Sequence, residues 1–306
     1  MSSLDLDKII LGHNQFFGTD HMSQERGAQK DQTFSQIDAV MDLIEYSYSL
    51  GVTGLMLSTH ERAKSIAEKI KQHPILKDNL NIYILLPYMA KYVRAANEKG
   101  IVTMITETLA DASWGQRFEI LAKGGWGVLS KDIESILEAM ITIELLPFKG
   151  LRMKAVFLHN ALTDLAVGYG LIAPLQFFMK TILEGFQSAP GFCTLNSALL
   201  LEFLDGHGIT GPLMMAPFNP VGFQMNPSKE TAEETLKKYT TQTIAMSILA
   251  AGHIRPSEAV AYLQTLPQIK SVIVGYSTKE HASEAVKAFK NNSKDLSTPF
   301  ALLNQR

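Results

Sequence analysis

The sequence has little cysteine, little net charge and no long apolar run. Cys193 is the single cysteine among 306 residues, which excludes an intrachain disulfide and predicts a reducing, cytoplasmic compartment. Lys and Arg (28) nearly balance Asp and Glu (30), which argues against nucleic acid as a partner. No basic and apolar leader begins the sequence, and no apolar run approaches the ~18–20 residues of a membrane span, so we expect neither secretion nor a membrane partner.

The composition and length of the chain are typical of a globular protein. Apolar residues make up 46% and charged residues 19% of the composition. At this length the chain can form one barrel-type domain or two smaller domains. Short apolar runs alternate with helix-period segments, the pattern of βα units around a parallel sheet.

Eight strands are expected from the apolar runs. They are Lys8–Gly12, Val52–Leu57, Asn81–Leu86, Met153–Leu158, Phe192–Leu195, Leu213–Ala216, Thr243–Leu249 and Ser271–Val274. Helices are expected between them, at Phe34–Leu50, Glu61–Gln72, from about Ala90, and at Pro174–Phe186, Ala198–Asp205, Ala232–Tyr239 and Pro256–Leu266. A last helix is expected to start at Ser277, where Ser277 and Glu280 fit a capping box.

Eight strands, each followed by a helix, predict a (β/α)8 TIM barrel formed by residues 1–306 as a single α/β domain. An open doubly wound sheet is the alternative. The glycine fingerprint of a dinucleotide-binding sheet is absent from the first turn, which runs from Gly12 to Gly18 without it.

One connection is enlarged. About sixty residues, roughly 89–150, separate the third and fourth strands, and they include Trp114 and Trp126. Because the segment follows a strand, it is either a lid over the barrel mouth or an extra helix packed on the outer ring.

The C-terminal part of the chain resembles an aldo-keto reductase. The resemblance lies in Thr243–Gly252, Pro256–Val260 and Ser271–His281, where a strand ends in a small-residue turn and a later strand reads Val-Ile-Val-Gly before a helix. Leu158-His159-Asn160 and Leu195-Asn196-Ser197 are similar to the ends of the family's fourth and fifth strands.

The resemblance implies an NADP-linked oxidoreductase acting on a small molecule, with the cofactor phosphate at the start of the final helix. It assigns cofactor binding to Gly252, Gly275, Tyr276, Ser277, Thr278 and Lys279. The physical basis is that a helix N-terminus exposes unpaired N–H groups, while Ser277 and Thr278 add hydroxyls.

Most of the family's catalytic residues are missing. The family uses an aspartate, a tyrosine, a lysine and a histidine. The aspartate should fall near Met56 or Leu57, the tyrosine within Thr59–Arg62, and the lysine within Leu86–Tyr88. Of the four, the sequence retains only His159, so the resemblance predicts the fold with a non-standard active site.

Polar residues at the other strand ends supply the remaining candidates. Because barrel chemistry arises at the carboxyl ends of the strands, the predicted catalytic residues are His159, His13, His60 and Tyr88. The predicted substrate-binding residues are Asn14, Gln15, Asn160, Asn196 and Asn219. No His-x-His or His-Glu-x-x-His spacing occurs, so no metal site is assigned.

Three functions stay open on this basis. The first is an NADP-linked oxidoreductase. The second is a lyase, isomerase or hydrolase using the strand-end histidines with or without a metal, and the third is a non-catalytic barrel that binds a ligand or a partner.

Overall fold

The computed structural model describes residues 4–18, 23–87 and 133–291. Eight parallel strands close into a barrel in chain order, and the register Ile9↔Val272 to Leu11↔Val274 joins the last strand to the first. The predicted (β/α)8 barrel is therefore confirmed. The strands are β1 (Ile9–Leu11), β2 (Gly54–Ser58), β3 (Asn81–Leu86), β4 (Arg152–Leu158), β5 (Ala189–Cys193), β6 (Leu213–Pro217), β7 (Gln242–Met246) and β8 (Ile269–Val274).

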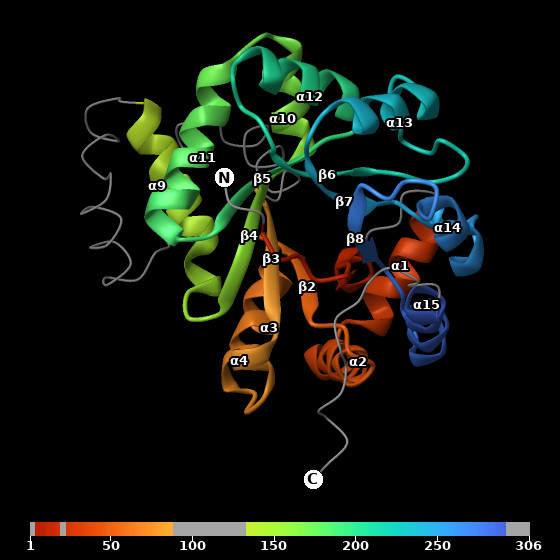
Figure 1. Ribbon diagram of the computed structural model, residues 1–306. Helices are drawn as coiled ribbons and strands as arrows, with labels where there is room; N and C mark the ends of the chain where they lie inside the picture. The colour runs from red at the N-terminus through yellow and green to blue at the C-terminus, as the bar shows by residue number, and fades with distance from the viewer. Residues whose placement is uncertain (1–3, 19–22, 88–132, 292–306) are drawn as a thin grey trace.

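Helices surround the barrel, as Figure 1 shows. In the first half of the chain they are α1 (Gln24–Thr33), α2 (Ile37–Ser49), α3 (Glu61–Gln72) and α4 (Leu76–Asn79). From residue 133 onward they are α9 (Ile133–Leu145), α10 (Asn160–Gly168), α11 (Ile172–Phe186), α12 (Ser197–Gly206), α13 (Lys229–Lys238), α14 (Pro256–Leu263) and α15 (Lys279–Asn291). Short 3-10 turns in the described ranges are η1 (Asn14–Phe17), η3 (Leu146–Phe148) and η4 (Ala250–Gly252).

Two apolar layers hold the fold together. The larger one lies between the strands and the helices, and the smaller one fills the barrel with side chains such as Ile10, Met56 and Phe157. Both faces of each parallel strand are thus buried, which explains why the strands read as nearly continuous apolar runs. Gly191 has no room for a side chain, because a Cβ there would lie 2.5 Å from Cε1 of Phe157.

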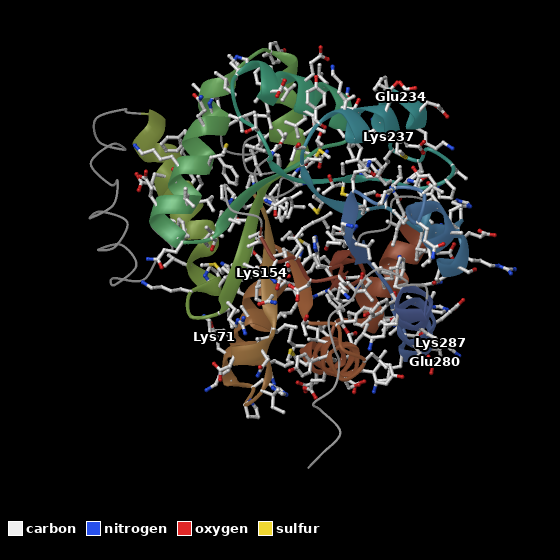
Figure 2. All side chains as sticks on the ribbon, viewed as in Figure 1. Lys71, Lys154, Glu234, Lys237, Glu280 and Lys287 are labelled. Atoms are coloured by element: carbon white, nitrogen blue, oxygen red, sulfur yellow. The ribbon has the colours of Figure 1, made fainter. Side chains whose placement is uncertain are left out.

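Charged side chains lie on the outer faces of the helices. Figure 2 shows Lys71 on α3, Glu234 and Lys237 on α13, and Glu280 and Lys287 on α15 at the edge of the molecule. Among the described residues, none of the helices combines the length and apolarity that crossing a bilayer would require.

One charged group is buried at the amino-terminal end of the barrel. The carboxylate of Asp7, which is 8% exposed, accepts hydrogen bonds from Thr53 Oγ1 (2.5 Å), Tyr83 Oη (2.6 Å) and Asn81 Nδ2 (2.9 Å). Lys154 Nζ pairs with it at 3.1 Å. Burial raises the pKa of Asp7, but the three hydrogen bonds and the Lys154 charge outweigh that effect and lower the pKa overall. The network joins the segment before β1 to β2, β3 and β4.

Some predicted boundaries were wrong, for local reasons. The fifth strand begins at Ala189 and not at the predicted Phe192. The prediction missed its start because Pro190 and Gly191 are typical turn residues, although both lie in the strand. The seventh strand ends at Met246 because the next residue, Ser247, adopts a left-handed conformation with φ 53°. Helices α1 and α10 were not predicted as separate elements. Thr278, not Ser277, caps α15, since its Oγ1 accepts from His281 N at 3.2 Å.

The enlarged connection is described only in its last part. Residues 88–132, with Trp114 and Trp126, lie outside the described residues, so the choice between a lid and an added helix stays open there. In the described part, α9 and η3 are packed on the barrel's outer layer through Ile141, Leu145 and Phe148.

Candidate active site

Two strand-end histidines cap helices at the barrel mouth. His60 follows β2 and its Nδ1 accepts a hydrogen bond from Arg62 N (3.0 Å) at the start of α3. His159 follows β4 and its Nδ1 accepts from Ala161 N (3.1 Å) at the start of α10. An Nδ1 that accepts a hydrogen bond carries no proton, so both rings are neutral with the hydrogen on Nε2.

The surroundings keep both rings neutral. Burial lowers the pKa of His159. Burial also lowers the pKa of His60, and the positive charge of Arg62 adds to that effect. Each Nε2–H is a donor at neutral pH, and Nε2 of His159 forms no hydrogen bond with the described residues. This arrangement suits donation to a carbonyl oxygen, the role that a neutral histidine at a helix N-terminus performs in known enzymes.

A half-buried carboxyl group anchors the helix that His159 caps. Asp164 on α10 accepts hydrogen bonds from Thr194 Oγ1 (2.5 Å) and Leu195 N (3.0 Å), just after β5. Burial raises the pKa of Asp164. The contact fixes α10 against the next strand and thereby fixes the position of His159.

The structure brings His13 and His60 together but separates them from His159. Phe17 stacks on the His60 ring at 4.6 Å and 18°, and it contacts His13 at 5.2 Å and 46°. These three rings form a row between the ends of β1 and β2, whereas His159 follows β4, with β3 in between. Tyr88, the fourth predicted catalytic residue, lies outside the described residues.

The predicted substrate-binding residues after β1 have different surroundings. Gln15 is 3% exposed, donates through Nε2 to Gly12 O (2.6 Å), and places its Oε1 3.0 Å from the position a Cβ on Gly275 would take. It therefore packs the loop after β1 against the loop after β8. Asn14, in η1, is exposed.

The other predicted substrate-binding residues are Asn160, Asn196 and Asn219, and the side chains of the last two form hydrogen bonds with the backbone. Asn196 caps α12 by accepting from Leu199 N (3.1 Å). Asn219 is fully buried, and both of its amide atoms bond the backbone of Phe223 at 2.8 Å. Asn160, the first residue of α10, is half-buried, and its side chain forms no hydrogen bond with the described residues, which leaves it the best placed to meet a substrate.

Backbone strain gathers in the loops after β6 and β7. Gln224, Ser247, Ala250 and Ala251 have φ values of 60°, 53°, 44° and 56°, in the left-handed region. Ser247 Oγ donates to Gln224 Oε1 (3.0 Å) and ties the two loops together. Strain of this kind persists where the surrounding structure enforces it, often at ligand sites. The sequence did not reveal it, since none of the four is a glycine.

The loop after β8 presents backbone groups rather than a cation. The backbone N–H groups of Gly275, Tyr276 and Ser277 form no hydrogen bond with the described residues. Lys279 instead pairs with Asp42 on α2 at 2.7 Å, and its Nζ lies 5.4 Å from the Tyr46 ring centre. Tyr276 is buried, which raises the pKa of its hydroxyl to about 12. Gly252 ends η4, in the loop after β7, with φ 91°.

No family model matches the sequence, and no curated protein matches it either. Solved structures do. A protein of Pseudomonas aeruginosa assigned to the aldo-keto reductases aligns with a TM-score of 0.56 at 13% identity, covering 94% of this chain and 90% of that one. The fold is that of the aldo-keto reductases. An aldo/keto reductase from Brucella melitensis aligns with a TM-score of 0.53 at 14% identity, over 92% and 88% of the two chains.

The aldo-keto reductase fold is present without the family's polar residues at the ends of β2 and β3. Met56 faces the barrel interior and Leu57 the helices, so neither expected aspartate position holds an acid. β3 ends at Leu86, followed by Pro87, with no lysine. Within the described residues, no group of three or more His, Cys, Asp or Glu side chains could hold a metal ion.

Proposed function

We propose that the chain is an enzyme that acts on the carbonyl group of a small molecule, with His159 as a neutral hydrogen-bond donor to the carbonyl oxygen. The observation that carries the proposal is the hydrogen bond from Ala161 N to Nδ1 of His159, which leaves Nε2–H to donate at the mouth. A donor aimed where negative charge develops stabilises the transition state without becoming protonated itself. Asn160, next in the chain, is placed to orient the same substrate.

The first candidate for this enzyme is an oxidoreductase that uses NADP. The loop after β8 has some of the groups that bind a phosphate. The backbone amides of Gly275, Tyr276 and Ser277 are available to donate, but Lys279 forms an ion pair with Asp42. The amides of this loop and the Ser277 hydroxyl would hold the phosphate. When bound, the nicotinamide group supplies a hydride, while His159 holds the carbonyl oxygen.

We expect the loop after β8 to bind NADPH and, more weakly, inorganic phosphate. Titration followed by NADPH fluorescence should saturate, and phosphate should compete. Replacing Gly275 with Val should weaken NADPH binding at least about tenfold, because a Cβ already meets Gln15 Oε1 at 3.0 Å and a larger side chain would displace the loop. Gly168→Ala, in α10 with open space around it, is the matched control. If NADPH and phosphate both fail to bind, the cofactor form of the proposal is withdrawn.

A second prediction follows from the missing residues. A panel of ordinary aldehydes and ketones with NADPH should show little or no turnover, because Thr59–Arg62 holds no tyrosine and Leu86-Pro87 no lysine to deliver a proton to the product alkoxide. The rate of NADPH oxidation measures this. Efficient turnover of the panel that disappears in Tyr88→Phe would show that a displaced tyrosine serves as the acid.

One observation favours a second candidate, an isomerase or lyase that needs no cofactor. Neutral His159 can polarise a carbonyl whether a hydride or a proton then moves, and Lys279, the cation at the start of α15, is paired with Asp42. Exchange of substrate α-hydrogens with deuterated water, in the absence of NADPH, would distinguish this candidate from the reductase.

A further inference from the structure

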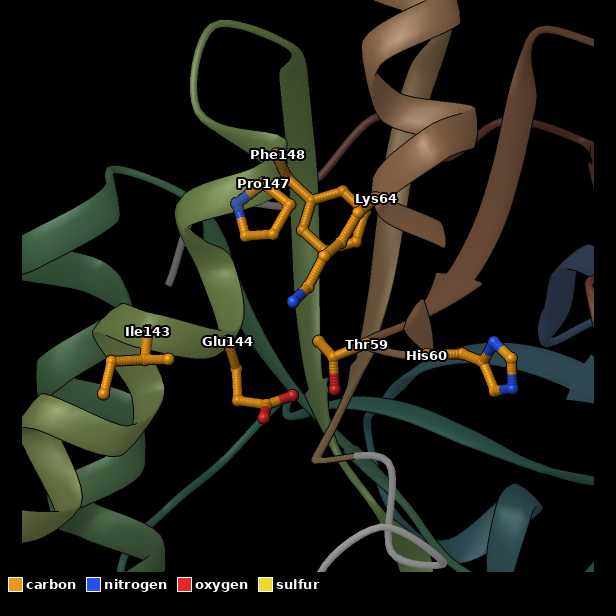
Figure 3. A pocket seen from close by; sticks show the side chains of 7 residues that line it. All are labelled: Thr59, His60, Lys64, Ile143, Glu144, Pro147 and Phe148. Atoms are coloured by element: carbon orange, nitrogen blue, oxygen red, sulfur yellow. The ribbon is translucent and has the colours of Figure 1, made fainter. Parts of the chain in front are cut away.

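Ser58, the last residue of β2, faces the inside of the barrel. Side chains alternate between the two faces of a strand, and Met56 packs in the barrel interior while Leu57 packs against the helices. Thr59, the next residue, borders instead a cleft against α9 and η3, which Figure 3 shows. That cleft encloses about 20 Å³, which is room for a water molecule but not for a substrate, so Thr59 is not positioned to bind one.

The hydroxyl group of Ser58 is buried without a hydrogen-bond partner. The residue is 4% exposed, and its Oγ forms no hydrogen bond with the described residues. A buried hydroxyl that stays unpaired lowers stability, and alanine would fill nearly the same space without that cost. The hydroxyl therefore serves a purpose other than packing. Rotation about a single side-chain torsion can turn it toward a ligand.

The side chains beside Ser58 form an apolar floor at the barrel mouth. Leu85 lies next to Ser58 in the strand register. Together with Met246 and Ile273 it packs on the interior core, yet all three are only half-buried, whereas Tyr83, one layer deeper, is fully buried. The half-buried side chains mark the open side of this layer, and such a floor suits the carbon skeleton of a ligand.

Ser58 and His159 are close enough for one small molecule to contact both. Ser58 pairs with Leu85, and Leu85 pairs with Phe157, two residues before His159. At ~4.8 Å between strands and ~3.3 Å per residue, the Cα atoms of Ser58 and His159 are on the order of 10 Å apart. Phe157 packs in the interior, and His159 has the same orientation because the ladder continues through its N–H to Leu86 O (2.8 Å). A molecule of a few carbon atoms can span the gap between the two side chains.

We propose that Ser58 is a specificity-determining residue, which binds a hydroxyl group of a short hydroxylated carbonyl compound while His159 donates to the carbonyl oxygen. A hydroxyl group both donates and accepts, as serine does, so each can satisfy the other. A carboxylate in that place would lose its water without meeting a positive charge, because the neighbours Leu85, Met246 and Ile273 are uncharged. This inference rests on the proposed function.

Binding of paired ketones to the whole chain tests the role of Ser58. The pairs are hydroxyacetone with 2-butanone, 4-hydroxy-2-butanone with 2-pentanone, and 5-hydroxy-2-pentanone with 2-hexanone, where a methyl group replaces the hydroxyl. Affinities are measured by ligand-observed NMR without cofactor. We expect at least one hydroxyketone to bind about tenfold more tightly than its partner, and Ser58→Ala to reduce that preference to about twofold or less.

The matched control is Ser271→Ala, which removes another buried hydroxyl, on β8 at the amino-terminal end of the barrel. It should keep the preference for the hydroxyketone. Stability gives a second reading. Ser271 Oγ donates to Asp7 O at 2.6 Å, so Ser271→Ala should lower the unfolding midpoint, whereas Ser58→Ala removes an unpaired hydroxyl and should leave the midpoint unchanged or raise it.

The proposal for Ser58 and the proposed function can fail separately. If no hydroxyketone is preferred, if the preference survives Ser58→Ala, or if Ser58→Ala lowers the midpoint as much as Ser271→Ala, Ser58 does not determine specificity. The corresponding diols test the carbonyl. If they bind as tightly as the hydroxyketones and His159→Asn changes nothing, while the preference still depends on Ser58, the role proposed for His159 is wrong and the hydroxyl site remains.

Discussion

Replacing Asp7 with alanine should lower the free energy of unfolding by about 3–5 kcal/mol, the cost of removing one partner from a buried ion pair. The substitution leaves Lys154 without its counter-ion, and the Tyr83 hydroxyl and Asn81 amide lose an acceptor. Urea denaturation followed by circular dichroism measures the change. The matched control is Asp38→Ala, whose side chain is 84% exposed and pairs with Lys69 at the surface, and which should change the stability by about 0.5 kcal/mol or less.

The same network predicts a pH dependence. Because the folded-state pKa of Asp7 is lowered, its contribution to stability is fully present above the unfolded value of about 4 and is lost as the pH falls through the folded pKa. The difference in unfolding free energy between the parent and Asp7→Asn should therefore be constant from pH 7 to about pH 5 and shrink at lower pH. A difference that stays constant down to pH 2 would show that the carboxylate charge does not stabilise the fold.

The barrel could be predicted from the sequence because each strand is marked by an apolar run within a few neighbouring residues. The interior strands are nearly continuous apolar runs, and β3 was placed at the same residues, Asn81–Leu86, that the structure gives it. The fifth strand was displaced because Pro190 and Gly191 are judged by their turn propensity, whereas the packing of Phe157 over Gly191 decides their conformation. That contact joins two strands and cannot be seen from either one.

The site was harder to predict than the fold. His60 and His159 were selected for their chemistry, but histidine is not among the preferred helix caps, so the sequence did not show that their Nδ1 atoms accept backbone hydrogen bonds. Gln15 was expected to meet a substrate, yet it packs against Gly275, a residue far along the chain.

Replacing His159 should reduce kcat/KM by about 10²- to 10⁴-fold, the range for a group that assists directly in the chemical step. The readout is turnover of any carbonyl substrate that a screen of the parent chain yields. His159→Ala removes both the imidazole and the helix cap, and the lost cap alone costs about 0.5–2 kcal/mol of stability. His159→Asn is the sharper variant, since asparagine is a strong helix cap and can accept from Ala161 N in place of the ring.

Comparing His159→Ala with His159→Asn distinguishes a role of His159 in the reaction from a role in stabilising α10. If His159 donates to the substrate, His159→Asn keeps the parent's unfolding midpoint but loses activity as fully as His159→Ala. If the residue only supports α10, His159→Asn retains activity, and the proposal fails. The pH profile gives an independent reading: because burial lowers the pKa of His159, the neutral ring persists below its usual 6.5. Activity should therefore be flat from pH 8 down to about pH 6.5 and fall only at lower pH, where protonation of Nδ1 also breaks the hydrogen bond from Ala161.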